Sequence, residues 1–76
     1  MTVQAYVLVF VDVGQSEKVT AALREIEGVK TAHSVTGMYD VIAFVEVEDS
    51  AALGQLVISK IQAIEGVGKT QTSVVI

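Results

Sequence analysis

The sequence predicts an α+β fold of the ferredoxin-like βαββαβ type, with a four-stranded antiparallel sheet and two helices on one of its faces. An internal repeat predicts the topology: residues 7–16 (VLVFVDVGQS) recur at 41–50 (VIAFVEVEDS), and Ile-Glu-Gly-Val at 26–29 recurs at 64–67. Each half therefore runs strand, polar turn, helix, Glu-Gly and strand, which is a βαβ unit with a right-handed crossover. Apolar residues alternate in the predicted strands, and in the segments between these strands they recur at helical spacing. Both patterns support the same order of elements.

The first half begins with a strand over residues 3–12, which is rich in the Val, Phe and Tyr residues that favour strands. Ser16 is the expected N-cap of the helix that follows, because a serine hydroxyl accepts hydrogen bonds from the first N–H groups of a helix. Gly28 fits the position just after this helix, and a strand over 29–36 completes the unit. The apolar residues at helical spacing are Val19, Ala22, Leu23 and Ile26.

In the second half, a turn at Gly37 leads into a strand over residues 39–48. The second helix is capped by Asp49 or Ser50, and a last strand covers 69–76. This helix is expected to be about one turn longer than the first, because the two repeats are offset by 34 and by 38 residues. Its apolar stripe comprises Leu53, Leu56, Val57, Ile61 and Ile64.

Both faces of the predicted sheet are apolar, but the two helices cover only one of them. Small side chains suit the helix-covered face, namely Val3, Ala5, Val7, Val9, Val11, Val41, Ala43, Val45 and Val47. Larger side chains occupy the other face, namely Tyr6, Leu8, Phe10, Ile42 and Phe44. Bare in a monomer, they would form a larger apolar patch than most soluble monomers expose. We therefore expect a homodimer in which these faces pack together in a two-sheet barrel or sandwich.

Length and composition exclude several classes of protein. The chain has 76 residues, a formal net charge of −4, no cysteine and one histidine. This length accommodates one domain, residues 1–76, and a domain so small usually needs disulfides, a metal or oligomerisation. Disulfides are impossible, one histidine is too few for a zinc site, and the acidic charge argues against direct nucleic-acid binding. With no membrane-spanning apolar run and no signal peptide, we expect a cytoplasmic protein without cofactor or metal.

The segment 35–40 (VTGMYD) is the candidate binding site. Gly37 can adopt positive φ in a sharp turn, and Asp40 is unfavourable at the start of a strand unless its carboxylate finds donors. One interpretation is structural, with Asp40 bonded to nearby backbone amides. The other is a site for a zwitterionic amino acid, whose carboxylate binds the free N–H groups of the turn while Asp40 receives its ammonium group. His33 is expected to be a structural strand residue, and no catalytic constellation can be assembled around it.

The order of elements, the VTGMYD turn and the closing strand GVGKTQTSVVI (66–76) resemble the C-terminal effector-binding domain, or RAM domain, of the Lrp/AsnC transcription regulators. The resemblance spans the whole chain, and its most specific parts are the Thr-Gly-x-Tyr-Asp turn and the Thr-x-Thr strand. Regulators of that family carry a helix-turn-helix domain ahead of this module. Because this chain begins at Met1 directly in the first strand, it resembles the stand-alone RAM type.

The resemblance implies a non-enzymatic effector sensor that binds an amino acid and forms a dimeric α/β barrel from two face-to-face sheets. The dimers would assemble further into tetramers, octamers or rings. The ligand would lie between dimers, where the turn meets the last strand of another subunit. The ligand-binding positions it implies are Gly37, Met38, Tyr39, Asp40, Thr70, Thr72 and Ser73. It also implies possible partners in full-length Lrp/AsnC regulators, whose control of transcription the module would modulate by co-assembly, without binding DNA itself.

Two alternatives stay open from the sequence. Small dimeric α/β barrels also include monooxygenases and stress-response enzymes, which use the barrel interior as a reaction chamber. Here that surface offers Tyr6, Phe10 and Glu46 but no evident reactive set. The other alternative is a purely structural oligomerisation domain. A ligand at the turn favours the sensor, whereas a ligand inside the barrel favours the enzyme.

Overall fold

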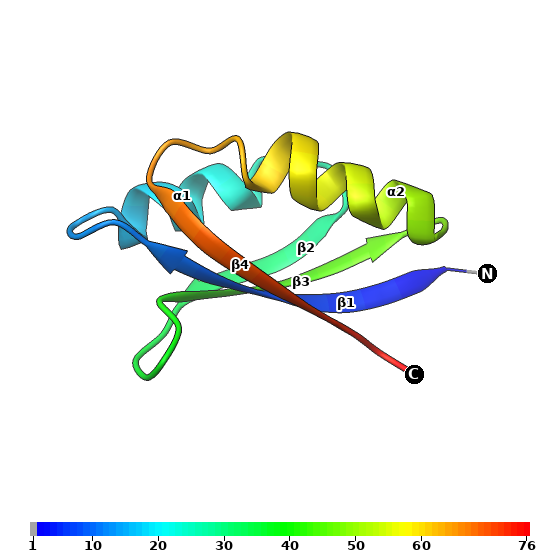
Figure 1. Cartoon of the computed structure of the whole chain (residues 1–76), viewed down its shortest axis with the longest axis horizontal. Helices are drawn as coiled ribbons and strands as arrows, with labels where there is room; N and C mark the ends of the chain where they lie inside the picture. Colours follow the sequence, from blue (N-terminus) through cyan, green and yellow to red (C-terminus); the bar gives the residue numbers. More distant parts are fainter. Residues whose placement is uncertain (1) are drawn as a thin grey trace.

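The computed structural model describes residues 2–76 as one sheet with helices on a single side (Figure 1). The strands are β1 (Val3–Val11), β2 (Val29–Ser34), β3 (Val41–Val47) and β4 (Val67–Val74). The helices are α1 (Ser16–Arg24) and α2 (Ser50–Gln55), which continues into the π-helix η1 (Leu56–Ile61). The sheet order is β2-β3-β1-β4 and every neighbouring pair is antiparallel. The predicted ferredoxin-like βαββαβ fold is confirmed.

Strand alternation determines where the core forms. The register of β1 with β3 sets Val7 against Ala43 and Val9 against Val41, so the small residues of both strands share one face. The helices cover this face (Figure 1), and its central side chains are fully buried. The buried apolar core consists of Ala5, Val7, Val9, Val19, Leu23, Ala32, Val41, Ala43, Val45, Leu53, Leu56, Val57 and Ile61.

The opposite side of the sheet, which we call the open face, is formed by Tyr6, Leu8, Phe10, Ile42 and Phe44 with their cross-strand neighbours Thr31, His33, Gln71 and Ser73. Its five apolar residues lie on the side that the sequence predicts. Tyr6 is 44% exposed, whereas the other four are half-buried, so the face is less bare than expected. One reason is that aromatic rings cover one another: the Tyr6 and Phe44 ring centroids are 5.0 Å apart.

Two boundary predictions for the first helix are wrong. Ser16 is the first helical residue, and Gln15 is the N-cap, because the Gln15 carbonyl already accepts the N–H of Val19 at 2.9 Å. The helix ends at Arg24, so Gly28 does not follow it directly. Gly28 instead has a φ of 99° in a tight turn. A hydrogen bond from the N–H of Val29 to the carbonyl of Ile26 closes this turn.

The second helix begins as predicted, since the Asp49 carboxylate accepts the N–H of Ala52 at 2.8 Å. Together α2 and η1, of six residues each, are about one turn longer than α1, which has nine. The widened π turn, in which the N–H of Gln62 bonds the carbonyl of Val57, was not expected. None of the helices in residues 2–76 is long and apolar enough to cross a membrane.

One ion pair ties α1 to the loop before β4. The Lys18 ammonium donates to a Glu65 carboxylate oxygen at 2.8 Å, and this hydrogen bond and charge lower the pKa of Glu65. A lowered pKa means that the pair stabilises the fold at neutral pH and loses this effect as the pH falls through the Glu65 titration. Both side chains are mostly exposed, so the contribution is small.

Two glycine-to-alanine changes test the backbone geometry. Gly66 has a φ of 102°, and an added Cβ would lie 3.1 Å from the Cβ of Gln15. Gly66→Ala should therefore destabilise the chain by about 1–3 kcal/mol. In α2, a Cβ on Gly54 would meet nothing within 4 Å, so Gly54→Ala should stabilise by about 0.5–1 kcal/mol. Urea unfolding measures the free energy of unfolding of both variants. Equal effects of the two changes would contradict the backbone geometry described for Gly66 and Gly54.

Candidate ligand site at the β2–β3 turn

The turn between β2 and β3 projects from the sheet on the side away from the helices (Figure 1). Its base is closed by the N–H of Val35, which donates to the carbonyl of Asp40 at 2.9 Å. Gly37 has a φ of 129°, and a Cβ built there would meet nothing within 4 Å. Glycine is therefore favoured by the backbone conformation and not by lack of space, as the sequence predicts.

Asp40 ends the ladder between β1 and β3. The register that pairs Val9 with Val41 would set Val11 against Tyr39, but the chain has already turned away there. The Asp40 carboxylate replaces the missing strand partner, because its Oδ2 accepts the N–H of Val11 at 2.9 Å. The backbone N–H of Asp40 donates to the carbonyl of Val9 at 3.0 Å. The structural interpretation of Asp40 is thus correct for one carboxylate oxygen. Its Oδ1 accepts no hydrogen bond within residues 2–76.

The backbone of the turn supplies the complementary donors. Within the part of the chain that the structure describes, the N–H groups of residues 36–39 donate no hydrogen bond. Four unbonded donors thus precede a carboxylate with one unbonded oxygen. Successive free N–H groups attract an anion, and a carboxylate attracts a cation. The turn therefore has the polarity that a zwitterionic ligand requires.

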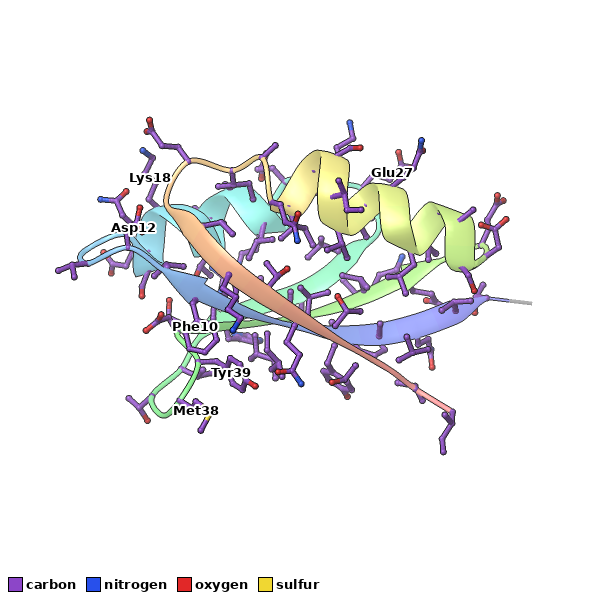
Figure 2. All side chains as sticks on the ribbon, in the orientation of Figure 1. Phe10, Asp12, Lys18, Glu27, Met38 and Tyr39 are labelled. Carbon is purple, nitrogen blue, oxygen red and sulfur yellow. The ribbon has the colours of Figure 1, made fainter. Side chains whose placement is uncertain are left out.

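Tyr39 lies across the end of the open face. Its ring centroid is 4.9 Å from that of Phe10, and its hydroxyl donates to Oε1 of Gln71 on β4 at 2.7 Å. Figure 2 shows Tyr39 and Phe10 close together below the sheet, with Met38 further out. Met38 is 78% exposed, so its side chain makes little contact within one chain.

The predicted β4 residues do not join the turn within one chain. Thr70 and Thr72 pair with Val9 and Val7, which places their side chains on the helix side, and the hydroxyl of Thr70 accepts from Nε2 of Gln62 at 2.9 Å. Ser73 lies on the open face opposite Tyr6. A role for these three toward the turn of another subunit stays a prediction.

Two residues of the turn's surroundings were missed from the sequence. Gln71 is the β4 residue that the turn contacts, and it stands between the two threonines of the Thr-x-Thr motif. Strand alternation places it on the open face beside Leu8, but nothing in the sequence indicates that Tyr39 reaches it. Val11 contributes only a backbone N–H, which no residue-type pattern can reveal.

Two other hollows on the surface lie apart from the turn. A shallow groove of about 760 Å³ runs between the end of α1, β3 and the α2–η1 helix, with Leu56 and Val47 among the side chains that line it. Glu25, Glu27, Glu48 and Lys60 also line it, so it presents mainly acidic groups to water. A smaller hollow adjoins edge strand β2. There, Nε of Arg24 donates a hydrogen bond to the outward-facing carbonyl of Ala32 at 2.9 Å. This bond protects a strand edge.

The fold defines a class: a small α+β module of ferredoxin-like topology with one sheet face left uncovered by its helices. Residues 4–76 match the Lrp/AsnC ligand binding domain. The chain belongs to that family, as the sequence analysis predicts. The fold is shared with solved structures: the protein TTHA0845 of Thermus thermophilus is 31% identical over 97% of this chain and 92% of that one, with a TM-score of 0.93.

Relatives carry this module within longer chains. A homocitrate synthase of Sulfolobus acidocaldarius is 40% identical over 58 residues, which are 76% of this chain and 12% of the synthase. An uncharacterised helix-turn-helix-type transcriptional regulator of Pyrococcus furiosus is 36% identical over 64 residues, which are 83% of this chain and 43% of the regulator. The chain thus corresponds to less than half of either relative.

Removing the Asp40 carboxylate should cost more stability than a surface charge normally does. Asp40→Ala leaves the part-buried N–H of Val11 without its acceptor, a loss of about 1–3 kcal/mol. Asp40→Asn keeps an acceptor oxygen and should lose less than half as much. The matched control is Asp12→Ala, whose exposed carboxylate accepts no hydrogen bond within residues 2–76 and should change stability by less than about 0.5 kcal/mol. Urea unfolding measures these free energies, and an equal loss of stability in Asp40→Ala and in the control would show that the Asp40–Val11 bond does not contribute.

Proposed function

We propose that this chain is a non-enzymatic, amino-acid-binding regulatory module that dimerises through its open face. The observation that carries the proposal is the polarity of the β2–β3 turn. Four free N–H groups at residues 36–39 lie next to an Asp40 carboxylate whose Oδ1 is unbonded. Charge-assisted hydrogen bonds at both ends select a ligand that carries a carboxylate and an ammonium group a short distance apart. Free α-amino acids have this arrangement.

Family membership supports a sensing role over catalysis. A transcriptional regulator and a homocitrate synthase both contain a segment similar to this chain, so the same module accompanies two unrelated outputs. A ligand-binding unit can serve both, because it reports ligand occupancy and leaves the response to its neighbours. The barrel-interior candidates do not gather into a reactive set: Glu46 accepts a hydrogen bond from Thr2 at 3.0 Å, and Tyr6 packs on Phe44.

A second copy of the chain is the proposed occupant of the open face. Covering its partly exposed aromatic and aliphatic side chains contributes several kcal/mol at about 25 cal/mol/Å². Its charges are also self-complementary. On this face Lys69 lies beside Phe10 at one end of β1, and Glu46 lies beside Gln4 at the other end. A twofold axis across the middle of the strands brings Lys69 of one copy toward Glu46 of the other.

Higher assembly follows from the same proposal. Within residues 2–76, Thr70, Thr72 and Ser73 make no hydrogen bond to the turn of their own chain, so we place the turn that completes a site with them on a subunit of another dimer. A ligand bound between dimers then favours the larger assembly, because only that assembly contains the complete site. Co-assembly with longer regulators that carry the same domain would transmit this response to transcription.

Calorimetry against the twenty amino acids tests ligand binding. We expect at least one to bind with a dissociation constant below about 1 mM, and Asp40→Asn to weaken binding by about tenfold or more, because an amide cannot compensate the ammonium charge. Asp12→Asn removes a carboxylate that lies outside the turn and should bind as the wild type does. No binding by any amino acid, or equal binding by Asp40→Asn, would contradict the proposed site.

A charge on the open face tests dimerisation. Phe44→Glu places a carboxylate where the second copy packs and should produce monomers at concentrations where the wild type is dimeric. The control is Val13→Glu, because Val13 is fully exposed in the turn after β1 and lies off this face. Sedimentation equilibrium measures both, and an unchanged assembly of Phe44→Glu would show that copies meet elsewhere.

A further inference from the structure

Tyr39 belongs to the turn but reaches the far edge of the sheet. Because the strand order is β2-β3-β1-β4, a side chain from the β2–β3 turn can contact β4 only by crossing β1. Tyr39 makes this crossing: its ring packs on Phe10 of β1, and its hydroxyl bonds Gln71 of β4. Figure 2 shows the ring on the open-face side of the sheet. The residue thus lies in the proposed ligand site and in the proposed dimer interface at once.

We infer that Tyr39 is a positioning residue that couples ligand occupancy of the β2–β3 turn to dimerisation through the open face. The inference rests on the proposed function. A second copy packed on the open face confines the Tyr39 ring against Phe10, and the confined ring holds the backbone of residues 36–39 in one conformation. A ligand bound to that backbone holds the ring in turn. Coupling of this kind is reciprocal by thermodynamic necessity.

The hydrogen bond between Tyr39 and Gln71 differs in strength between the single chain and the dimer. In a single chain this bond is exposed and competes with water. A second copy that covers the open face excludes that water, so the same bond is stronger in the dimer. A contact that is stronger in one state than in the other shifts the equilibrium between them. The phenol hydroxyl, which phenylalanine lacks, is therefore the group to remove.

The test combines two measurements on the full chain without ligand, at protein concentrations below and above the dimer dissociation constant. Sedimentation equilibrium gives that constant, and ¹⁵N relaxation gives the order parameters of the Gly37 and Met38 N–H groups, which report backbone motion even where an amide is not hydrogen-bonded. In the wild type, both order parameters should rise from below about 0.6 towards about 0.85 as dimers form. Tyr39→Phe should weaken dimerisation by about three- to tenfold, the range expected for one hydrogen bond, and should make the order parameters of the turn independent of concentration.

Three further variants make the test specific. Gln71→Ala should match Tyr39→Phe, and the double variant should be no weaker than either single one, because both changes remove the same bond. Tyr6→Phe is the matched control: it removes a hydroxyl from the same face, but that hydroxyl makes no hydrogen bond within residues 2–76. Tyr6→Phe should keep the concentration dependence of the turn order parameters.

Two results would overturn the inference alone. Wild-type dimers whose turn order parameters are the same at every concentration, or Tyr39→Phe dimers that keep the concentration dependence, would show that the turn and the interface are independent, and the proposed function would stand. A wild type that stays monomeric throughout would overturn the inference together with the proposed dimer, and sedimentation distinguishes this failure from the other two.

Discussion

Burial of one sheet face under two helices is the interaction on which the rest of this structure depends. A chain of 76 residues has only enough helix to cover one side of its four strands. The centre of the valine- and alanine-rich side is covered and fully buried, and this side provides most of the hydrophobic stabilisation. The period-two alternation that puts these residues inside puts Tyr6, Phe10 and Phe44 on the other side. An uncovered aromatic face is therefore a direct consequence of how the core forms.

The turn at Gly37 to Asp40 follows from the same constraint at one end of the sheet. When β3 begins, the chain has to leave the ladder before Val11 can pair, and the Asp40 carboxylate satisfies that N–H in its place. One carboxylate oxygen is used structurally and the other is left over, beside backbone donors that the turn itself leaves free. A single residue thus completes the fold and provides half of the proposed site. Tyr39, folded onto Phe10, then connects this site to the open face.

Most of the fold could be predicted because it depends on patterns that extend over many residues. Alternation in β1 and β3, the internal repeat and the stripe of α2 each combine several side chains, and all three agreed with the structure. The errors fell at the ends of elements, where few side chains contribute: β4 covers Val67–Val74 where 69–76 was predicted, and β2 ends at Ser34 where 36 was predicted. Other errors depend on a single hydrogen bond. Gln15 and not Ser16 caps α1 because of one carbonyl, and the π turn in η1 changes the bonding pattern without changing the apolar spacing. Gln71 was missed because a contact between the turn and β4 depends on one side-chain rotamer.

Packing of a second copy on the open face can be observed directly by isotope-filtered NMR. In an equal mixture of labelled and unlabelled chains, the account predicts intermolecular nuclear Overhauser effects between the Tyr6, Phe10 and Phe44 rings of one copy and open-face protons of the other. Helix residues such as Ile58 should show none, although Ile58 is exposed. Intermolecular contacts confined to the helices, or no intermolecular contact at any concentration, would show that no second copy covers the open face.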